Sequence, residues 1–241
     1  MNTANDNQQT TELKTIIEET IPSVIPLLMA IGNNSAYFPS IYRGVSDKSF
    51  DLIPSLGRIE NEELSKMDDA TIISFLDLRE KEMLDLFKSK SIPYLNYNPN
   101  TYYEWLVLAQ HHGVPTRLLD WSTNCLVALY FAINGAYDKD GALYFYETPG
   151  NIHFEESLLF HKDSVLRPKH IDFRIINQCS VFTIHSMPHK PLRHERLKKF
   201  IIPSHCKKQF EIDISRLGIN REILFPGLDS IGYTASRMYK Y

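Results

Sequence analysis

The chain has 241 residues, of which 43% are hydrophobic and 23% are charged. This composition is typical of folded globular proteins and lies outside the range of intrinsic disorder. The 26 Lys and Arg residues against 29 Asp and Glu residues give a formal net charge of −3, which offers no general attraction for nucleic acid or anionic lipid. These values exclude a disordered scaffold and argue against nucleic acid and membranes as partners, so any phosphate binding must depend on a local group of residues.

The N-terminal segment, MNTANDNQQTTELK, has neither a basic start nor an apolar stretch, so it lacks the features of a signal peptide. No apolar run approaches the length that is needed to span a bilayer. We therefore expect a cytoplasmic protein, with residues 1–10 as a polar, disordered tail in front of a domain formed by residues 11–241.

The cysteines and histidines do not form a metal-binding pattern. The three cysteines are widely spaced, which suits neither a disulfide framework nor a paired metal site; they are Cys125, Cys179 and Cys206. His185 and His189 have a spacing that allows chelation from one helical turn, but Pro188 between them argues against that helix. We therefore predict no bound metal.

Apolar residues recur at helical spacing early in the chain, at Leu13, Ile16, Ile17 and Ile21. This pattern predicts a helix that ends at Pro22. The later segment AYFPSIYRGVSD is rich in aromatic and β-branched residues, which favours a strand. Arg43 and Gly44 come where this strand enters a turn, so we expect Arg43 at a strand end.

Three helices are expected in the middle of the chain. An amphipathic stretch after Asp68 predicts a long helix, and a second helix is expected over residues 100–111. Their inward-facing residues should be Ile72, Leu76, Met83 and Phe87 in the first, and Tyr102, Trp105, Leu106 and Ala109 in the second. Residues 126–133 are apolar nearly all round, which predicts a core helix with Ser122 or Thr123 as its cap.

The segments GALYFYE, SVFTIHS and KKFIIP are short runs of β-branched or aromatic residues that predict strands. Near the end, Ser204 can cap a helix with Phe210, Ile214 and Leu217 on one face, and Gly218 suits its left-handed C-terminal cap. No repeat, low-complexity linker or composition break divides the chain. We therefore predict one α+β domain with several helices and a mixed or antiparallel sheet of short strands.

The segment QHHGVPTRLLDWS has a high density of chemically active groups: Gln110, His111, His112, Arg117, Asp120 and Trp121. Pro115 fixes its own φ and restricts the residue before it, so residues 110–121 are expected to form a rigid polar loop. A histidine can transfer protons near neutral pH. Successive residues at a helix end point about 100° apart, so one of the two histidines should face solvent.

Two explanations of the charged pair in this segment stay open. Arg117 and Asp120 are three residues apart, so they either form an ion pair that ties the loop to the core or belong to a site. The side chain of Trp121 is interpreted as packing. Arg43 with Gly44 suits a phosphate site, because an arginine can grip a phosphate while a glycine lets the backbone approach closely.

Several motifs together resemble the FRG domain. They are Tyr42-Arg43-Gly44, LIPS with Arg58, AQHHGVPTRLLDWSTNCLVALYFA, INQCSVFTIH, and the closing LGIN and LFPGLDSIG. The resemblance covers nearly the whole chain, and it departs from the family at Gly227, where an Asp is usual, and after Ile231. It implies a bacterial or phage protein of the kind that is met in defence or toxin settings.

The chain also resembles ADP-ribosyltransferases more weakly. In those enzymes an Arg-Gly on the first strand grips NAD, and a Ser/Thr motif precedes a helix written A-x-x-F-A. Arg43-Gly44 matches the first motif, and Ser122-Thr123 with residues 128–132 matches the second loosely. The resemblance implies an ADP-ribosyltransferase-like fold with NAD as the cofactor.

The third motif of those enzymes is a catalytic Glu on a later strand, and this chain has Gln178 there. A carboxylate would stabilise the positive charge that develops as the glycosidic bond breaks, whereas a neutral amide retains only a hydrogen bond. The resemblance therefore implies one of two outcomes. Either Asp120 supplies the acid, or the domain binds a nucleotide without transferring ADP-ribose.

Two functions remain in competition. The first is an enzyme acting on NAD or another nucleotide, with His111, Asp120 and Gln178 as catalytic residues and Arg43, Gly44, Gln110, Arg117 and Ser122 as binding residues. The second is an interaction or sensor module, with a protein target or regulatory partner, in which these residues form a structural network. Convergence on an open cleft favours the first, and mutual satisfaction in the core favours the second. A metal-dependent nuclease ranks last, because the chain has neither a carboxylate-rich motif nor a basic stripe.

Overall fold

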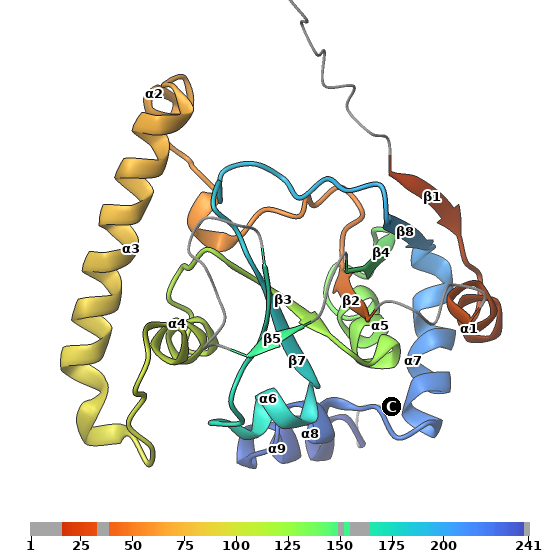
Figure 1. The fold of residues 1–241 in the computed structure, drawn as a ribbon. Helices are drawn as coiled ribbons and strands as arrows, with labels where there is room; N and C mark the ends of the chain where they lie inside the picture. Colours follow the sequence, from red (N-terminus) through yellow and green to blue (C-terminus); the bar gives the residue numbers. More distant parts are fainter. Residues whose placement is uncertain (1–15, 33–38, 149–151, 155–163, 239–241) are drawn as a thin grey trace, which may run out of the picture.

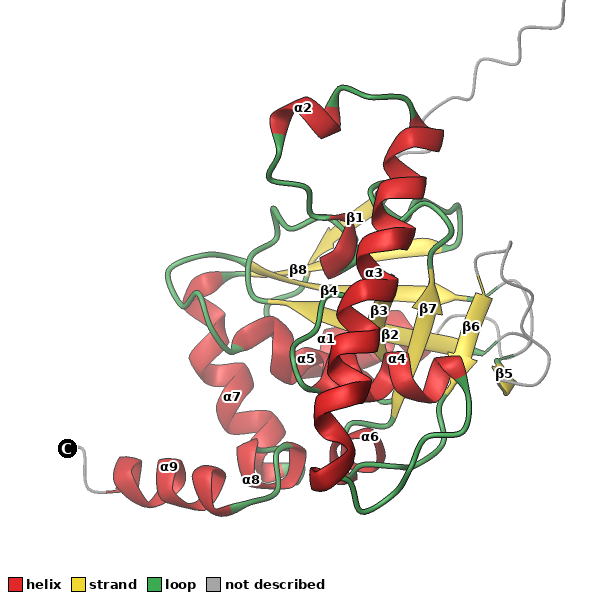
Figure 2. Ribbon diagram, turned by 90° about the vertical axis from the view of Figure 1, so that its left-hand side faces the viewer, coloured by secondary structure: helices red, strands yellow, loops and turns green. Residues whose placement is uncertain are grey.

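The computed structural model describes residues 16–32, 39–148, 152–154 and 164–238 (Figures 1 and 2). In these residues one mixed sheet has the strand order β1-β8-β4-β2-β3-β7-β6-β5. The strands are β1 (Ile17–Thr20), β2 (Ser40–Val45), β3 (Leu118–Ser122), β4 (Gly141–Glu147), β5 (His153–Phe154), β6 (Ser164–Arg167), β7 (Ser180–Ile184) and β8 (Leu197–Ile202). The β1–β8 and β5–β6 pairs are parallel and the others are antiparallel. The α+β class and the mixed sheet of short strands are confirmed.

The helix that was predicted to end at Pro22 is wrong. Residues 17–20 form β1, which pairs in parallel with β8 from Ile17 opposite Lys198. Hydrogen bonding to the open edge of β8 satisfies this backbone, and Ile17 is 65% exposed, so the apolar spacing does not mark a buried helical face. Pro22 does end the element, and a helix that was not predicted follows it, α1 (Val24–Gly32). Leu13 and the predicted tail lie outside the described residues.

The long helix predicted after Asp68 and the helix predicted over residues 100–111 are confirmed. They are α3 (Asp69–Ser91) and α4 (Tyr102–His111). Asp68 caps α3 by accepting a hydrogen bond from the backbone N of Thr71 at 3.0 Å, and Thr101 caps α4. The buried face of α3 contains Ile72, Leu76, Glu80 and Leu84, whereas Met83 and Phe87 are half-buried. The charged residue in this row, Glu80, was not predicted.

The core helix is confirmed as α5 (Cys125–Ile133), but its predicted cap is wrong. Asn124 caps it, with its side-chain oxygen accepting from the backbone N of Leu126 at 2.9 Å. Ser122 is instead the last residue of β3, and its Oγ accepts from the backbone N of Asn124 at 3.0 Å. Ser122 belongs to a strand rather than to the start of the helix because the ladder with β7 continues to Ser122 opposite Ser180.

The predicted C-terminal helix is α7 (Lys207–Arg216), and the left-handed Gly218 after it is confirmed at φ 86°. Two details differ. Ser204 begins a separate 3-10 turn (Ser204–Cys206) in front of the helix, and Leu217 is 55% exposed rather than buried. The remaining short helices are α2 (Glu62–Ser65), α6 (Phe173–Asn177), α8 (Arg221–Leu224) and α9 (Leu228–Met238), with 3-10 turns at Ser55–Gly57 and Ile92–Tyr94.

The helices divide the hydrophobic core into separate parts. One cluster joins α1, α5 and α7 to β2, β4 and β8, and another joins α3 and α4 to β3, β6 and β7. Figure 1 shows α3 and α4 at one flank of the molecule and α1 and α7 at the other. The boundary between the two clusters falls where β2 meets β3. In the described part of the chain, no helix combines the length and the apolar character that a membrane span requires.

Candidate functional site

β2 and β3 are neighbours in the sheet but pair at one position, Tyr42 opposite Ser122. β2 pairs with β4 over its whole length, from Ser40 to Val45. The strands therefore part beyond Tyr42, and a cavity of about 440 Å³ lies at this opening. Its volume is in the range of small-molecule sites. The end of α4 and one side of α5 also line it.

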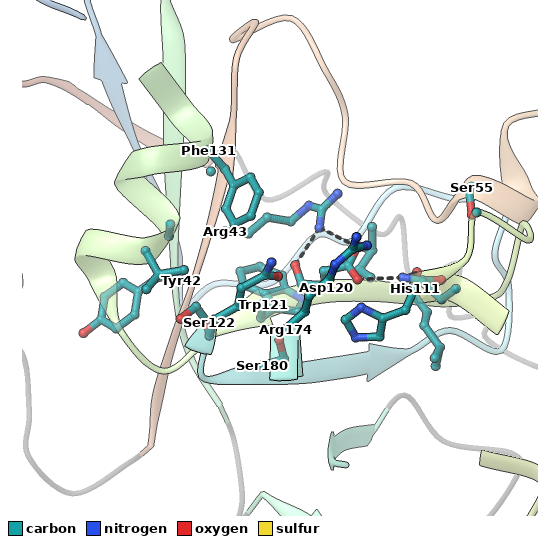
Figure 3. A pocket seen from close by; sticks show the side chains of 18 of the residues that line it. Tyr42, Arg43, Ser55, His111, Asp120, Trp121, Ser122, Phe131, Arg174 and Ser180 are labelled. Atoms are coloured by element: carbon teal, nitrogen blue, oxygen red, sulfur yellow. Dashed lines mark hydrogen bonds and ion pairs between the residues drawn. The ribbon is translucent and has the colours of Figure 1, made fainter. Parts of the chain in front are cut away.

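Seven of the eight site residues that the sequence predicted line this cavity. They are Arg43, Gly44, Gln110, His111, Asp120, Ser122 and Gln178. They come from β2, the end of α4, β3 and the turn before β7, so segments far apart in the chain meet here (Figure 3). The eighth residue, Arg117, is not part of the lining.

Arg43 and Asp120 form the central contact of the cavity (Figure 3). Arg43 Nη1 donates to the main-chain O of Asp120 at 2.6 Å and lies 3.3 Å from its Oδ2. The guanidinium thus takes the place of a ladder hydrogen bond across the strand opening. Gln110 Nε2 donates to Asp120 Oδ1 at 2.9 Å, and the Oγ1 of Thr116 donates to Gln110 Oε1. The Asp120 side chain remains 55% exposed, so a ligand can reach its carboxylate.

The prediction of one rigid loop over residues 110–121 is wrong in its second half, because residues 118–122 form β3. Ladder pairing with β7 fixes this segment. Trp121 is 3% exposed, and its Nε1 donates to Thr183 Oγ1 at 2.9 Å. The interpretation of its side chain as packing is therefore confirmed, although part of the residue borders the cavity.

Arg117 pairs with α3 and not with Asp120. Its Nε lies 2.6 Å from Glu80 Oε2, and its Nη2 lies 2.5 Å from Asp77 Oδ1. Burial alone would lower the pKa of Arg117, but the two carboxylates outweigh that effect and raise it. The Arg117–Asp120 pair that the spacing suggested does not form, and Arg117 joins the segment before β3 to α3.

The hydroxyl of Ser122 and the amide of Gln178 are both engaged at the cavity wall. Ser122 Oγ donates to the main-chain O of Gln178 at 2.7 Å, and Gln178 Nε2 donates to the main-chain O of Leu224 at 3.0 Å. The next residue, Cys179, has φ 48°, a left-handed conformation that disfavours side chains with a Cβ. These contacts hold the turn before β7 against β3 and α8.

Gly44 is explained by helix packing. A Cβ on this residue would lie 1.8 Å from the main-chain O of Ala128 and 2.5 Å from the main-chain N of Ala132. Only a glycine lets the backbone of α5 approach β2 this closely. Gly44 thereby brings Ala128 and Phe131 of α5 to the cavity wall.

The two histidines at the end of α4 have different surroundings, as the sequence predicted. His112 is exposed and stacks on Phe87, with ring centroids 6.1 Å apart. His111 lines the cavity, and its buried Nε2 has no hydrogen-bond partner in the described part of the protein. Burial lowers the pKa of His111, and this outweighs the opposing effect of Asp120. His111 is therefore neutral at neutral pH and can accept or donate one hydrogen bond to a ligand.

His111 should make the protein less stable in acid. Because its folded pKa is lowered, the unfolded chain takes up the proton first, so the free energy of unfolding decreases as the pH falls below about 6.5. Urea denaturation at about pH 7.5 and about pH 5.5 measures this loss. His111→Gln should reduce the difference between the two values. A difference that His111→Gln leaves unchanged would contradict the assignment.

Several lining residues were not predicted as site residues, namely Ser55, Arg58, Phe131, Arg174, Ser180 and Phe225. All of them except Arg174 belong to the motifs that resemble the FRG domain, so that signal was available. Phe131 and Phe225 form an aromatic corner, with ring centroids 6.0 Å apart and planes at 82°. No sequence signal marked Arg174.

The described residues hold no group of three or more His, Cys, Asp and Glu side chains that is arranged to bind a metal. The two histidines with the chelating spacing have other partners. His185 Nε2 is 2.8 Å from Thr183 Oγ1, and His189 Nε2 is 3.0 Å from Asp69 Oδ1.

Comparison with known proteins identifies one relationship. The sequence model of the FRG domain matches residues 39–141, which run from the start of β2 to the start of β4 and contain Arg43, Gln110, His111 and Asp120. Neither the curated proteins nor the solved structures include a significant match. The family match covers the segments that build most of the cavity, so an FRG domain is present within residues 39–141.

Proposed function

We propose that the cavity at the β2–β3 opening binds NAD and that the FRG domain cleaves it, either to free ADP-ribose or by transfer to an acceptor. The observation that carries this proposal is the convergence of seven predicted residues on one accessible cavity. The resemblance of Arg43-Gly44 and Ser122-Thr123 to ADP-ribosyltransferase motifs concerns two of the four segments that meet there. Polar groups that converge on a cleft are typical of binding and catalytic sites.

The lining suits a nucleotide. Phe131 and Phe225 offer aromatic faces on which a base can stack. Nε and Nη2 of Arg43 form no hydrogen bond to a described residue, so they remain available to a phosphate. Figure 3 shows Phe131 beside Arg43 at the cavity.

Asp120 is the acidic side chain of the site. No other Asp or Glu is among the residues that line the cavity in the described part of the chain. Gln178 has its amide directed to the main-chain O of Leu224, which supports Asp120 rather than Gln178 in the charged role. Arg43 and Gln110 fix the orientation of the Asp120 carboxylate from two sides.

In the proposed reaction the bond between the ribose C1′ and the nicotinamide nitrogen breaks. Nicotinamide leaves as a neutral molecule with the bonding electron pair, and positive charge develops on the ribose. The Asp120 carboxylate stabilises that charge. Water or an acceptor group then bonds to C1′ and loses a proton, which the neutral imidazole of His111 can accept.

The test is release of nicotinamide from NAD, with and without cell lysate as a source of acceptor or activator. NAD labelled in its adenosine part separates free ADP-ribose from label transferred to protein. Asp120→Asn keeps the shape and the Gln110 contact, so we expect nicotinamide release to fall by about 10²–10³-fold while NAD still binds. Arg43→Ala should weaken NAD binding. Failure of the unsubstituted protein to release nicotinamide under both conditions would contradict the enzymatic function.

One observation favours the non-catalytic alternative. Thr116, Gln110, Asp120 and Arg43 already form a continuous chain of hydrogen bonds, as expected for a structural network. A sensor or interaction module would bind NAD or ADP-ribose without turnover. Binding that depends on Arg43, combined with no nicotinamide release, is the result that would select this alternative.

The FRG family resemblance suggests a biological setting for either activity. An enzyme that consumes NAD or modifies a protein target would act as a toxin or a phage-defence effector. Expression of the unsubstituted protein and of Asp120→Asn in bacteria measures this directly. Growth arrest and falling NAD levels are expected with the former and not with the latter.

A further inference from the structure

We infer that Arg58 and Arg174, together with Arg43, form a binding site for the diphosphate group of a ligand in this cavity. The inference deepens the function proposed above and rests on it for the identity of the ligand. The arginines come from three separate parts of the chain. Arg43 is in β2, Arg58 follows the 3-10 turn Ser55–Gly57, and Arg174 is in α6. All three line the same cavity.

The charge of the lining is strongly unbalanced. Three guanidinium groups face one carboxylate, Asp120, and 3 − 1 leaves two positive charges in excess. His111 does not change this sum at neutral pH, because burial lowers its pKa. The whole chain carries a net charge of −3, so the excess is a local property of the cavity. A diphosphate diester carries one negative charge on each phosphate and would balance it.

Arg58 has no carboxylate partner among the described residues. Its Nε donates to the main-chain O of Ile53 at 3.3 Å, which leaves both Nη atoms available to a ligand. Burial lowers the pKa of Arg58, and the neighbouring charge of Arg43 lowers it further, against an opposing effect of Asp120. Two guanidiniums that repel one another across a cavity are stabilised when an anion binds between them.

Arg174 approaches from another side of the cavity. Its guanidinium carbon is 5.9 Å from the ring centroid of Phe225, and its charge contributes to lowering the pKa of His111. The nearby Asp172 is the cap of α6, where its Oδ1 accepts from the main-chain N of Arg174 at 2.6 Å. Its charge opposes that of Arg174 in setting the pKa of His111, but Asp172 is not among the residues that line the cavity. No ion pair to Arg174 forms in the part of the chain that the structure describes.

The chain offers a matched control in Arg79. This arginine lines a neighbouring cavity of about 490 Å³ between the 3-10 turn Ser55–Gly57 and α3, which also contains Arg58. It does not line the cavity at the β2–β3 opening. Arg79→Ala therefore removes one nearby exposed positive charge without removing a proposed phosphate ligand. Arg58 and Arg174 are also exposed, so their replacement by alanine should leave the fold intact, which circular dichroism can check.

The experiment is calorimetric titration of the full chain with inorganic pyrophosphate, inorganic phosphate, adenosine and ADP-ribose. We expect pyrophosphate and ADP-ribose to bind more tightly than phosphate and adenosine. Arg58→Ala and Arg174→Ala should each weaken pyrophosphate and ADP-ribose binding by at least about tenfold, whereas Arg79→Ala should change neither. Loss of affinity should be smaller at higher salt, where charge interactions are screened.

The outcomes separate this inference from the proposed function. ADP-ribose binding that requires Arg43 but not Arg58 or Arg174 would overturn the diphosphate site and leave the proposed function standing. An equal effect of Arg79→Ala would overturn it as well. Pyrophosphate binding that requires Arg58 and Arg174, without binding of ADP-ribose or NAD, would support the anion site and overturn the proposed function. The absence of all binding would overturn both.

Discussion

Replacement of Gly44 by alanine is expected to lower the free energy of unfolding by at least about 3 kcal/mol. The new Cβ would lie 1.8 Å from the main-chain O of Ala128 and 2.5 Å from the main-chain N of Ala132. Both contacts are with the backbone of α5, so no side chain can rotate away. α5 would have to move off β2, and its buried residues pack in the main hydrophobic cluster. Urea denaturation measures the loss directly.

Gly232→Ala is the control for this experiment. Gly232 lies within α9, and a Cβ there would have no neighbour within 4 Å. Alanine favours a helix over glycine by about 1 kcal/mol, so this variant should be as stable as the unsubstituted protein or more so. The account of Gly44 fails if Gly44→Ala keeps full stability. If Gly44→Ala keeps full stability but no longer binds NAD, the glycine instead serves to let the ligand approach the backbone of β2.

Replacement of Glu80 by alanine is expected to lower the free energy of unfolding by about 3–5 kcal/mol. Glu80 is 1% exposed and accepts hydrogen bonds from the main-chain N of Arg117 at 2.7 Å, from Arg117 Nε at 2.6 Å and from the hydroxyl of Tyr102 at 3.0 Å. Its removal leaves these partly buried donors without this acceptor. It also removes the buried link between α3 and the segment that leads into β3, where the exposed Asp77–Arg117 pair remains.

Asp77→Ala provides the matched comparison on the same helix. Asp77 also pairs with Arg117, but its side chain is 52% exposed, and exposed pairs contribute about 0–1 kcal/mol. Denaturation midpoints of the two variants should therefore differ clearly. Similar losses for Asp77→Ala and Glu80→Ala would show that burial does not determine the strength of this network.

The contacts of Arg117 with α3 explain why this residue, which was predicted to bind a ligand, does not line the cavity. The spacing of Arg117 and Asp120 suggested a local pair, whereas each has a distant partner, Glu80 and Arg43 respectively. Successive side chains of a strand point to opposite faces of the sheet. The spacing of two residues in the sequence does not reveal which other strands or helices lie beside each of them. A signal for Glu80 was present, because it continues the row formed by Ile72 and Leu76 at intervals of four residues.

The elements with strong local patterns were predictable. The amphipathic row of α3, the Thr101 cap of α4 and the continuous apolar run of α5 each determine a helix locally. β1 was not predictable, because its conformation depends on pairing with β8, about 180 residues later in the chain. The convergence of Arg43, Asp120 and Gln178 followed from the resemblance to known motifs, whereas the contribution of Arg174 required the position of α6.

The central claim is that the cavity at the β2–β3 opening is a nucleotide site, and a crystal structure with bound ADP-ribose tests it most directly. We predict density in this cavity, with the base near Phe131 and Phe225 and the diphosphate against Arg43, Arg58 and Arg174. Density for ADP-ribose at another surface would contradict the claim. So would an unoccupied cavity in crystals grown at a concentration of ADP-ribose that saturates the protein in solution.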